Sequence, residues 1–83
     1  MSLRVGWTPR ALKEARRVDK QTLVRVRAAL DRLASTGEGD VVKLHDIEPP
    51  EYRLRVGEHR VRFRYRGEVL EVLHVLPRGK AYR

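Results

Sequence analysis

A stretch of fifteen residues in the last third of the chain, YRLRVGEHRVRFRYR at 52–66, is crowded with arginine. It holds six arginines and a single acidic residue, Glu58. A guanidinium group stays charged at any physiological pH, and its fork of N–H donors matches two oxygens of a phosphate at once. The chemistry that suits this stretch is therefore the binding of phosphate groups.

The order of residues in this stretch places its arginines on one face of a β-hairpin. Side chains of a strand point to opposite faces in turn, and Gly57-Glu58 is typical of a two-residue hairpin turn. With this turn the arginines form two cross-strand pairs, Arg53 with Arg62 and Arg55 with Arg60. Like charges directly opposite each other destabilise a strand pair, so we interpret this face as a binding surface for a polyanion.

The next run, EVLEVLHVL at 68–76, predicts a third strand beside the hairpin. Simple alternation places four of its side chains on the apolar face, namely Leu70, Val72, His74 and Leu76. On that face His74 is interpreted as a core histidine. Glu71 falls on the arginine side, where we expect it to neutralise Arg62 or Arg64.

Before the hairpin, the sequence predicts one strand and two helices. LRVGW at 3–7 alternates like a strand, and Thr8-Pro9 suits a helix start, with Thr8 as the cap. Asp19 is a second capping residue. Apolar residues at helical spacing follow it and stop near Gly37.

These elements give the order strand–helix–helix–strand–strand–strand. Pro49 and Pro50 exclude regular structure in the segment before Tyr52, so four strands are expected. We predict an α+β fold in which a helical hairpin packs on one face of a curved, mostly antiparallel four-stranded sheet. A chain of 83 residues suffices for one such domain, expected to span residues 1–83.

The composition indicates an anionic partner and argues against several function classes. The net charge is +8 and the sequence pI is about 10.8, which favours nucleic acid, an anionic membrane surface or an acidic protein as partner. Cysteine is absent and the three histidines are scattered, so neither a metal site nor a cofactor is expected. No run is apolar enough to span a membrane and no signal peptide is recognisable, so a cytoplasmic location is expected.

Several motifs together resemble the RelE/ParE superfamily of toxins, and RelE-type members in particular. They are WTPRALK at 7–13, LDRLA at 30–34, VKL at 42–44, YRLRVGEHRVRFRY at 52–65 and VLPRGKAYR at 75–83. The resemblance covers nearly the whole chain and implies the fold predicted above. It also implies a toxin that cuts mRNA in the ribosomal A site, and an acidic antitoxin that blocks the toxin in a hetero-oligomer.

The resemblance further implies roles for individual residues. The implied catalytic residues are Arg53, Arg55, Arg60, Arg78 and Tyr82. The residues expected to bind RNA are Lys43, Arg62, Arg64 and Lys80.

The implied reaction is RNA cleavage without a metal ion. The 2′-OH attacks the adjacent phosphorus, and preorganised cations such as Arg60 stabilise the charge on the phosphoryl oxygens. Tyr82 is the expected general base. RelE itself has lysines where Arg53 and Arg55 stand, and because arginine cannot release a proton, the general acid stays unassigned.

Two other functions stay open on the sequence alone. ParE-like members of the superfamily poison DNA gyrase without catalysis. A catalytically weak member would act only with its antitoxin, as a DNA-binding autorepressor. The combination of Arg60, Arg78 and Tyr82 favours the nuclease.

Overall fold

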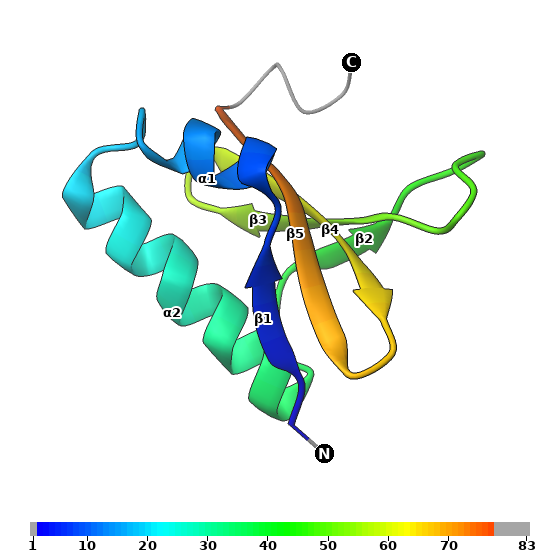
Figure 1. Ribbon diagram of the computed structural model, residues 1–83. Coiled ribbons are helices and arrows are strands. Elements are labelled where there is room, and N and C mark those ends of the chain that lie inside the picture. The colour runs from blue at the N-terminus through cyan, green and yellow to red at the C-terminus, as the bar shows by residue number, and fades with distance from the viewer. Residues whose placement is uncertain (1, 78–83) are drawn as a thin grey trace.

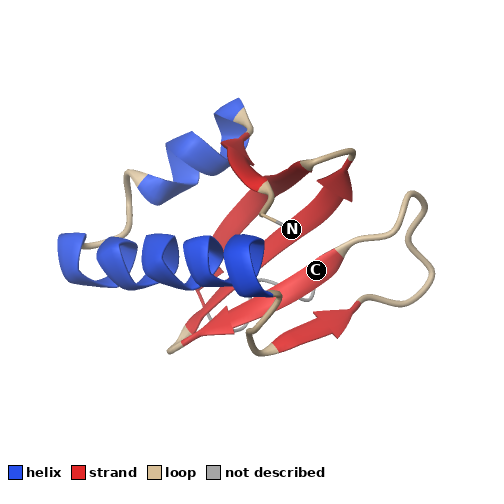
Figure 2. Ribbon diagram, turned by 90° about the horizontal axis from the view of Figure 1, so that it is seen from below, coloured by secondary structure: helices blue, strands red, loops and turns tan. Residues whose placement is uncertain are grey.

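The fold consists of two helices and five strands, shown along the chain in Figure 1. The computed structural model describes residues 2–77. In chain order the elements are β1 (Arg4–Trp7), α1 (Pro9–Ala15), α2 (Lys20–Thr36), β2 (Val41–Lys43), β3 (Tyr52–Val56), β4 (His59–Arg66) and β5 (Val69–Pro77). The strands form one sheet in the order β1-β5-β4-β3-β2, in which β1 and β5 are parallel and the other neighbours antiparallel. Both helices lie on one face of this sheet, the helix face (Figure 2), which confirms the predicted α+β architecture.

Helix α1 begins where the sequence predicts, because the Thr8 hydroxyl caps its first turn and also contacts β5. Its oxygen accepts a hydrogen bond from the N–H of Ala11 at 3.1 Å and donates one to the carbonyl of Val72 at 2.9 Å. The first contact caps the helix and the second ties its start to β5. Helix α1 accordingly packs mainly against β5.

Helix α2 has both predicted end signals. The Asp19 carboxylate accepts a hydrogen bond from the N–H of Thr22 at 3.1 Å, and Gly37 ends the helix in the left-handed region at φ 79°. Near this end, the carbonyl of Ala34 accepts a hydrogen bond from the N–H of Leu3 at 2.9 Å, so α2 is tied to the strand at the far edge of the sheet.

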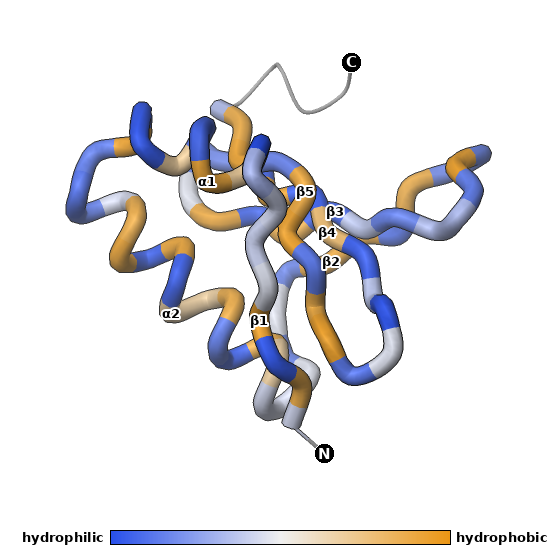
Figure 3. Tube along the Cα trace, viewed as in Figure 1, coloured by the Kyte–Doolittle hydropathy of each residue, from blue (hydrophilic) through white to orange (hydrophobic). Residues whose placement is uncertain are grey.

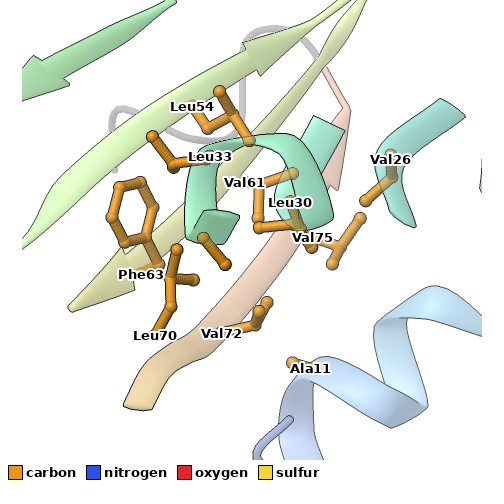
Figure 4. Packing of buried hydrophobic residues seen from close by; sticks show 11 residues of the cluster. Ala11, Val26, Leu30, Leu33, Leu54, Val61, Phe63, Leu70, Val72 and Val75 are labelled. Carbon is orange, nitrogen blue, oxygen red and sulfur yellow. The ribbon is translucent and has the colours of Figure 1, made fainter. Parts of the chain in front are cut away.

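The hydrophobic core lies between α2 and the helix face (Figure 4). Apolar residues recur in each helix and strand between polar ones, as the hydropathy colouring in Figure 3 shows. The largest fully buried side chains come from both layers and are Phe63, Leu30, Leu54, Leu70, Val26, Val61 and Val72. Each such side chain contributes about 1.5–3 kcal/mol on burial, so the predicted inward positions of the strands carry much of the fold's stability.

The prediction of four strands was one strand short. Val41–Lys43 forms β2, which pairs with β3 in the register Val41 with Leu54, Val42 with Arg53 and Lys43 with Tyr52. The two prolines lie in the loop between β2 and β3 and do not interrupt either strand. A strand of three residues is too short for its alternation to show in the sequence.

The predicted register of the β3–β4 hairpin is confirmed, including the pairs Arg53–Arg62 and Arg55–Arg60. The β4–β5 register, by contrast, shifts at a β-bulge between Arg62 and Phe63. Phe63 pairs with Val72 and Arg62 with His74, which leaves Leu73 as the extra residue.

The bulge reverses the side-chain alternation in the second half of β5. Val75, predicted to face away from the helices, is 2% exposed in the core. His74 and Leu76, predicted on the helix face, pair instead with Arg62 and Arg60 on the opposite face. The interpretation of His74 as a core histidine was therefore wrong.

Candidate nucleic-acid interface

The face of the sheet opposite the helices carries the arginine cluster. We call it the arginine face and define it by five side chains of β3 and β4: Arg53, Arg55, Arg60, Arg62 and Arg64. These positions alternate with Leu54, Val61 and Phe63, which are buried in the core, so the arginines must point the other way.

Two carboxylates neutralise one end of the arginine face. The Arg62 Nη2 atom lies 2.6 Å from the Glu51 Oε1 atom, and Arg64 Nε lies 2.7 Å from Glu71 Oε1. Arg66, at the end of β4, also forms an ion pair with Glu71, and its Nη1 atom lies 3.5 Å from Glu71 Oε2. The expected neutralisation by Glu71 is confirmed and falls on Arg64.

Arg60 has a different environment. Its residue exposure is only 8%, and its Nη1 atom lies 3.3 Å from the carbonyl oxygen of His59 and 3.5 Å from that of Gly57. Within residues 2–77, no carboxylate forms an ion pair with it. A permanent charge that is buried beside carbonyl dipoles alone costs free energy, which an anionic ligand would offset.

Arg53 and Arg55 lie beside Arg60 on β3. Arg55 stands directly opposite Arg60 and is exposed, and it also borders a pocket that is lined in part by Asp40, the residue before β2. Arg53 is half-buried between Arg62 on one neighbouring strand and Val42 on the other. The arginine face thus has one end at which Glu51 and Glu71 pair with Arg62 and Arg64. We call the other end, which consists of Arg53, Arg55 and Arg60, the cation-rich end.

Lys43, expected to bind RNA, lies on the other face. It pairs with Tyr52, whose side chain packs toward the core, and so it projects on the helix face. There it is near a cluster in which Tyr65 contacts Tyr52 at a centroid distance of 5.2 Å. Partial burial, and to a lesser degree Tyr52, raises the pKa of Tyr65, so this ring stays neutral at physiological pH.

Three of the expected site residues, Arg78, Lys80 and Tyr82, lie outside the described residues. Their assignment to the site stays a prediction from the sequence.

Sequence reasoning missed two residues of this face. Glu51 lies two positions before Arg53, so alternation alone would place it on the arginine side, but it directly follows Pro50, where no regular strand is expected. His74 had no usable signal, because the position of a β-bulge is not visible in the pattern of apolar residues.

Neither a metal cluster nor a membrane helix is found in the described part of the chain. Residues 2–77 contain no group of three or more His, Asp or Glu side chains arranged to hold a metal ion. None of the helices among these residues is long and apolar enough to cross a membrane.

A match to a family model shows to which protein family the chain belongs. The model of the family described as ParE toxin of type II toxin–antitoxin system, parDE, matches residues 5–82. The chain belongs to the ParE toxin family. It is thus a toxin of a type II toxin–antitoxin system within the RelE/ParE superfamily, as the sequence motifs implied.

Two solved structures share the fold of this ParE-family toxin. A chain of the archaeal RelE–RelB complex from Pyrococcus horikoshii OT3 matches with a TM-score of 0.77 and 26% identity, covering 96% of this chain and 99% of that chain. The YoeB dimer from Staphylococcus aureus matches with a TM-score of 0.74 and 18% identity, covering 92% and 97% respectively. The search of curated proteins found no match.

Proposed function

We propose that this toxin is a ribosome-dependent mRNA endonuclease whose reaction takes place at the cation-rich end of the arginine face. One observation carries the proposal: Arg60 is a nearly buried charge without an acidic partner in the described residues. Such a group costs stability and is best explained by an anionic group that it binds. The likeness to a chain of an archaeal RelE–RelB complex over 96% of this chain also supports the nuclease proposal.

The arrangement suits attack of an RNA 2′-OH on the adjacent phosphate. During this attack negative charge builds on the phosphoryl oxygens, and fixed guanidinium groups stabilise it without having to reorganise. Arg60 is held in place by its burial, whereas Arg53 and Arg55 are the neighbouring groups that bind flanking phosphates. The product on the upstream side is a 2′,3′-cyclic phosphate, and the downstream fragment carries a 5′-OH.

Gyrase inhibition is the second candidate, because the matching family model is that of ParE toxins. A gyrase inhibitor requires a binding surface but no arrangement for moving protons. The two functions therefore predict different effects of the same protein on RNA and on DNA supercoiling.

The two candidates are separated by testing the purified toxin in parallel assays. Ribosomes programmed with a defined mRNA are incubated with the toxin, and the 5′ ends of the fragments are mapped. Cuts inside the A-site codon, absent without ribosomes, are the expected result. Inhibition of gyrase-driven supercoiling together with intact mRNA would replace the proposal by the second candidate.

We also propose that the partner antitoxin covers the arginine face with an acidic segment. The support is the net charge of +8, the self-repelling arginine pairs and the likeness to a RelE–RelB complex. Arg55→Glu should weaken antitoxin binding strongly, whereas Arg27→Glu on the exposed side of α2 should have a small effect. Equal effects in a calorimetric titration would show that the antitoxin binds elsewhere.

A further inference from the structure

The β-bulge in β5 turns His74 from the core to the arginine face. Leu73 is the extra residue, and Val72 and Val75 on either side are both buried in the core. His74 therefore pairs with Arg62, and the next pair on the same face of the sheet is Arg60 with Leu76. Bulges are enriched beside active sites, where they redirect a side chain in this way.

The pairing of β5 with β1 ends at Val72, so β5 is an edge of the sheet at His74, and a carboxylate from α1 reaches one nitrogen of the His74 ring there. The Nδ1 atom lies 3.4 Å from Glu14 Oε2, and the other oxygen of Glu14 accepts the N–H of Val75 at 2.9 Å. The side chains of Glu14 and His74 are only 18% and 28% exposed, so the pair is largely shielded from water. Within residues 2–77 the Nε2 atom has no hydrogen-bond partner.

A carboxylate on Nδ1 and an unengaged Nε2 form the arrangement in which a histidine exchanges a proton with a substrate. The carboxylate fixes the orientation of the ring and stabilises the imidazolium form. None of the five arginines that define the arginine face releases a proton near neutral pH, because guanidinium groups stay protonated. An imidazolium at His74 can supply the proton that they cannot.

We infer that His74 is the general acid of the cleavage reaction and that Glu14 is its positioning residue; this inference rests on the proposed nuclease function. The bond from the 2′ oxygen to phosphorus forms and the bond from phosphorus to the 5′ oxygen breaks. The leaving 5′ oxygen takes the proton from Nε2 of the imidazolium, and the 2′-OH proton passes to solvent water. The histidine is left neutral, with its Nδ1 proton on the side of Glu14.

Several charged groups surround this imidazole. Glu14 of α1 contacts its Nδ1 atom, and Arg10 of the same helix lies 3.8 Å from that carboxylate. Arg62 pairs with His74 from β4, and Glu51 neutralises Arg62. Glu71 precedes His74 on the same face of β5.

A bridging sulfur in the substrate distinguishes a general acid from any other role. In an mRNA whose scissile 5′ oxygen is replaced by sulfur, the leaving thiolate needs no protonation. His74→Ala should cut the ordinary mRNA on programmed ribosomes about 10²-fold more slowly than the parent, and should cut the sulfur-containing mRNA at the parent's rate. Arg60→Ala should be slow on both substrates, and His45→Ala, in the exposed loop before β3, should resemble the parent on both.

The positioning role of Glu14 has its own test. Glu14→Gln keeps an acceptor for the Val75 N–H but removes the charge that favours the imidazolium. The alkaline limb of the pH–rate profile should therefore move to lower pH, whereas a purely structural role would lower the rate equally at every pH. His74→Gln should abolish that limb on the ordinary mRNA.

The possible outcomes lead to separate conclusions. A His74→Ala variant that is slow on both substrates, or that equals the parent on both, overturns the inference while leaving the nuclease function standing. If the parent cuts neither substrate, the proposed function itself fails, and the inference fails with it. Circular dichroism and urea unfolding of each variant show whether it is folded, and normal cleavage of the sulfur substrate is independent proof of a folded site.

Discussion

Arg62 and Glu51 form a close ion pair that is largely removed from water. Their side chains are 15% and 20% exposed, and the joining distance is 2.6 Å. The Nε atom of Arg62 is itself buried and has no hydrogen-bond partner among the described residues. Glu51 thus compensates most of the charge of Arg62, and removing the Glu51 carboxylate should lower the free energy of unfolding substantially.

Replacing Glu51 by glutamine should destabilise the fold. Gln at this position leaves Arg62 charged and poorly compensated, and we expect the free energy of unfolding to fall by about 1–3 kcal/mol. Urea denaturation measures the change. Glu38→Gln is the matched control, because Arg32 and Glu38 form an ion pair whose side chains are 68% and 63% exposed, and its loss should cost at most about 1 kcal/mol. Equal losses for both variants would contradict the assigned role of Glu51.

At the level of residues, the sequence predicted which residues pair across strands better than it predicted how deeply each side chain is buried. The Arg55–Arg60 pair followed from alternation and a two-residue turn, which are both local properties. That Arg60 is buried and Arg55 exposed depends on the whole fold, and no pattern in the hairpin distinguishes the two. His74 was misplaced because one extra residue in β5 reverses the alternation after it.

At the level of elements, the ends of helix α2 show how local signals become stability. The Thr22 hydroxyl donates to Asp19 Oδ1 at 2.6 Å and the Thr22 N–H donates to Oδ2 at 3.1 Å. Both hydrogen bonds lower the pKa of Asp19 below its usual value, and the bond from the Thr22 hydroxyl has the larger effect. The ionised cap is therefore preferred in the folded state.

Acid should weaken this cap. Because the pKa of Asp19 is lower in the folded than in the unfolded chain, its stabilisation is present above the unfolded pKa and is lost as the pH falls below about 4. Asp19→Asn keeps a capping side chain without the titration. The urea midpoint of the parent should thus fall more steeply between pH 6 and pH 2.5 than that of the variant. Parallel pH profiles of the two midpoints would contradict this assignment.

A helix or strand was predicted more accurately when its local sequence signals were stronger. Helix α2 has a cap, an apolar stripe and a terminal glycine, and both of its ends were correct. Strand β2 has three residues and forms only because β3 offers an edge to pair with, which is a tertiary effect. The bulge in β5 is likewise a consequence of packing, since it lets Val75 enter the core.

For the molecule as a whole, only part of the net charge of +8 acts at the arginine face. Glu51 and Glu71 neutralise Arg62 and Arg64. We expect the phosphate contacts to lie at the cation-rich end, with Arg53, Arg55 and Arg60. The field of the remaining surface charges steers an anionic partner toward the protein but does not fix its orientation.

The salt dependence of RNA binding should reflect this small number of contacts. Three phosphates neutralised on a single strand give a slope of log affinity against log salt of about −2, at roughly −0.7 per contact. Fluorescence anisotropy with a short unstructured RNA measures the slope. Glu51→Gln, which releases Arg62, should make it steeper by about 0.7. A slope near zero would show that the arginine face does not bind phosphates.

Single-turnover cleavage by an Arg60→Met variant is the most direct test of the central claim, which is that the buried Arg60 charge is held for catalysis. Met fills similar space without the charge, so the fold should lose little stability or even gain some. On programmed ribosomes the cleavage rate should fall on the order of 10²–10³-fold while ribosome affinity changes little, and Arg27→Met on the exposed side of α2 should cut like the parent. An Arg60→Met variant that binds ribosomes and cuts mRNA at the parent's rate would contradict the claim.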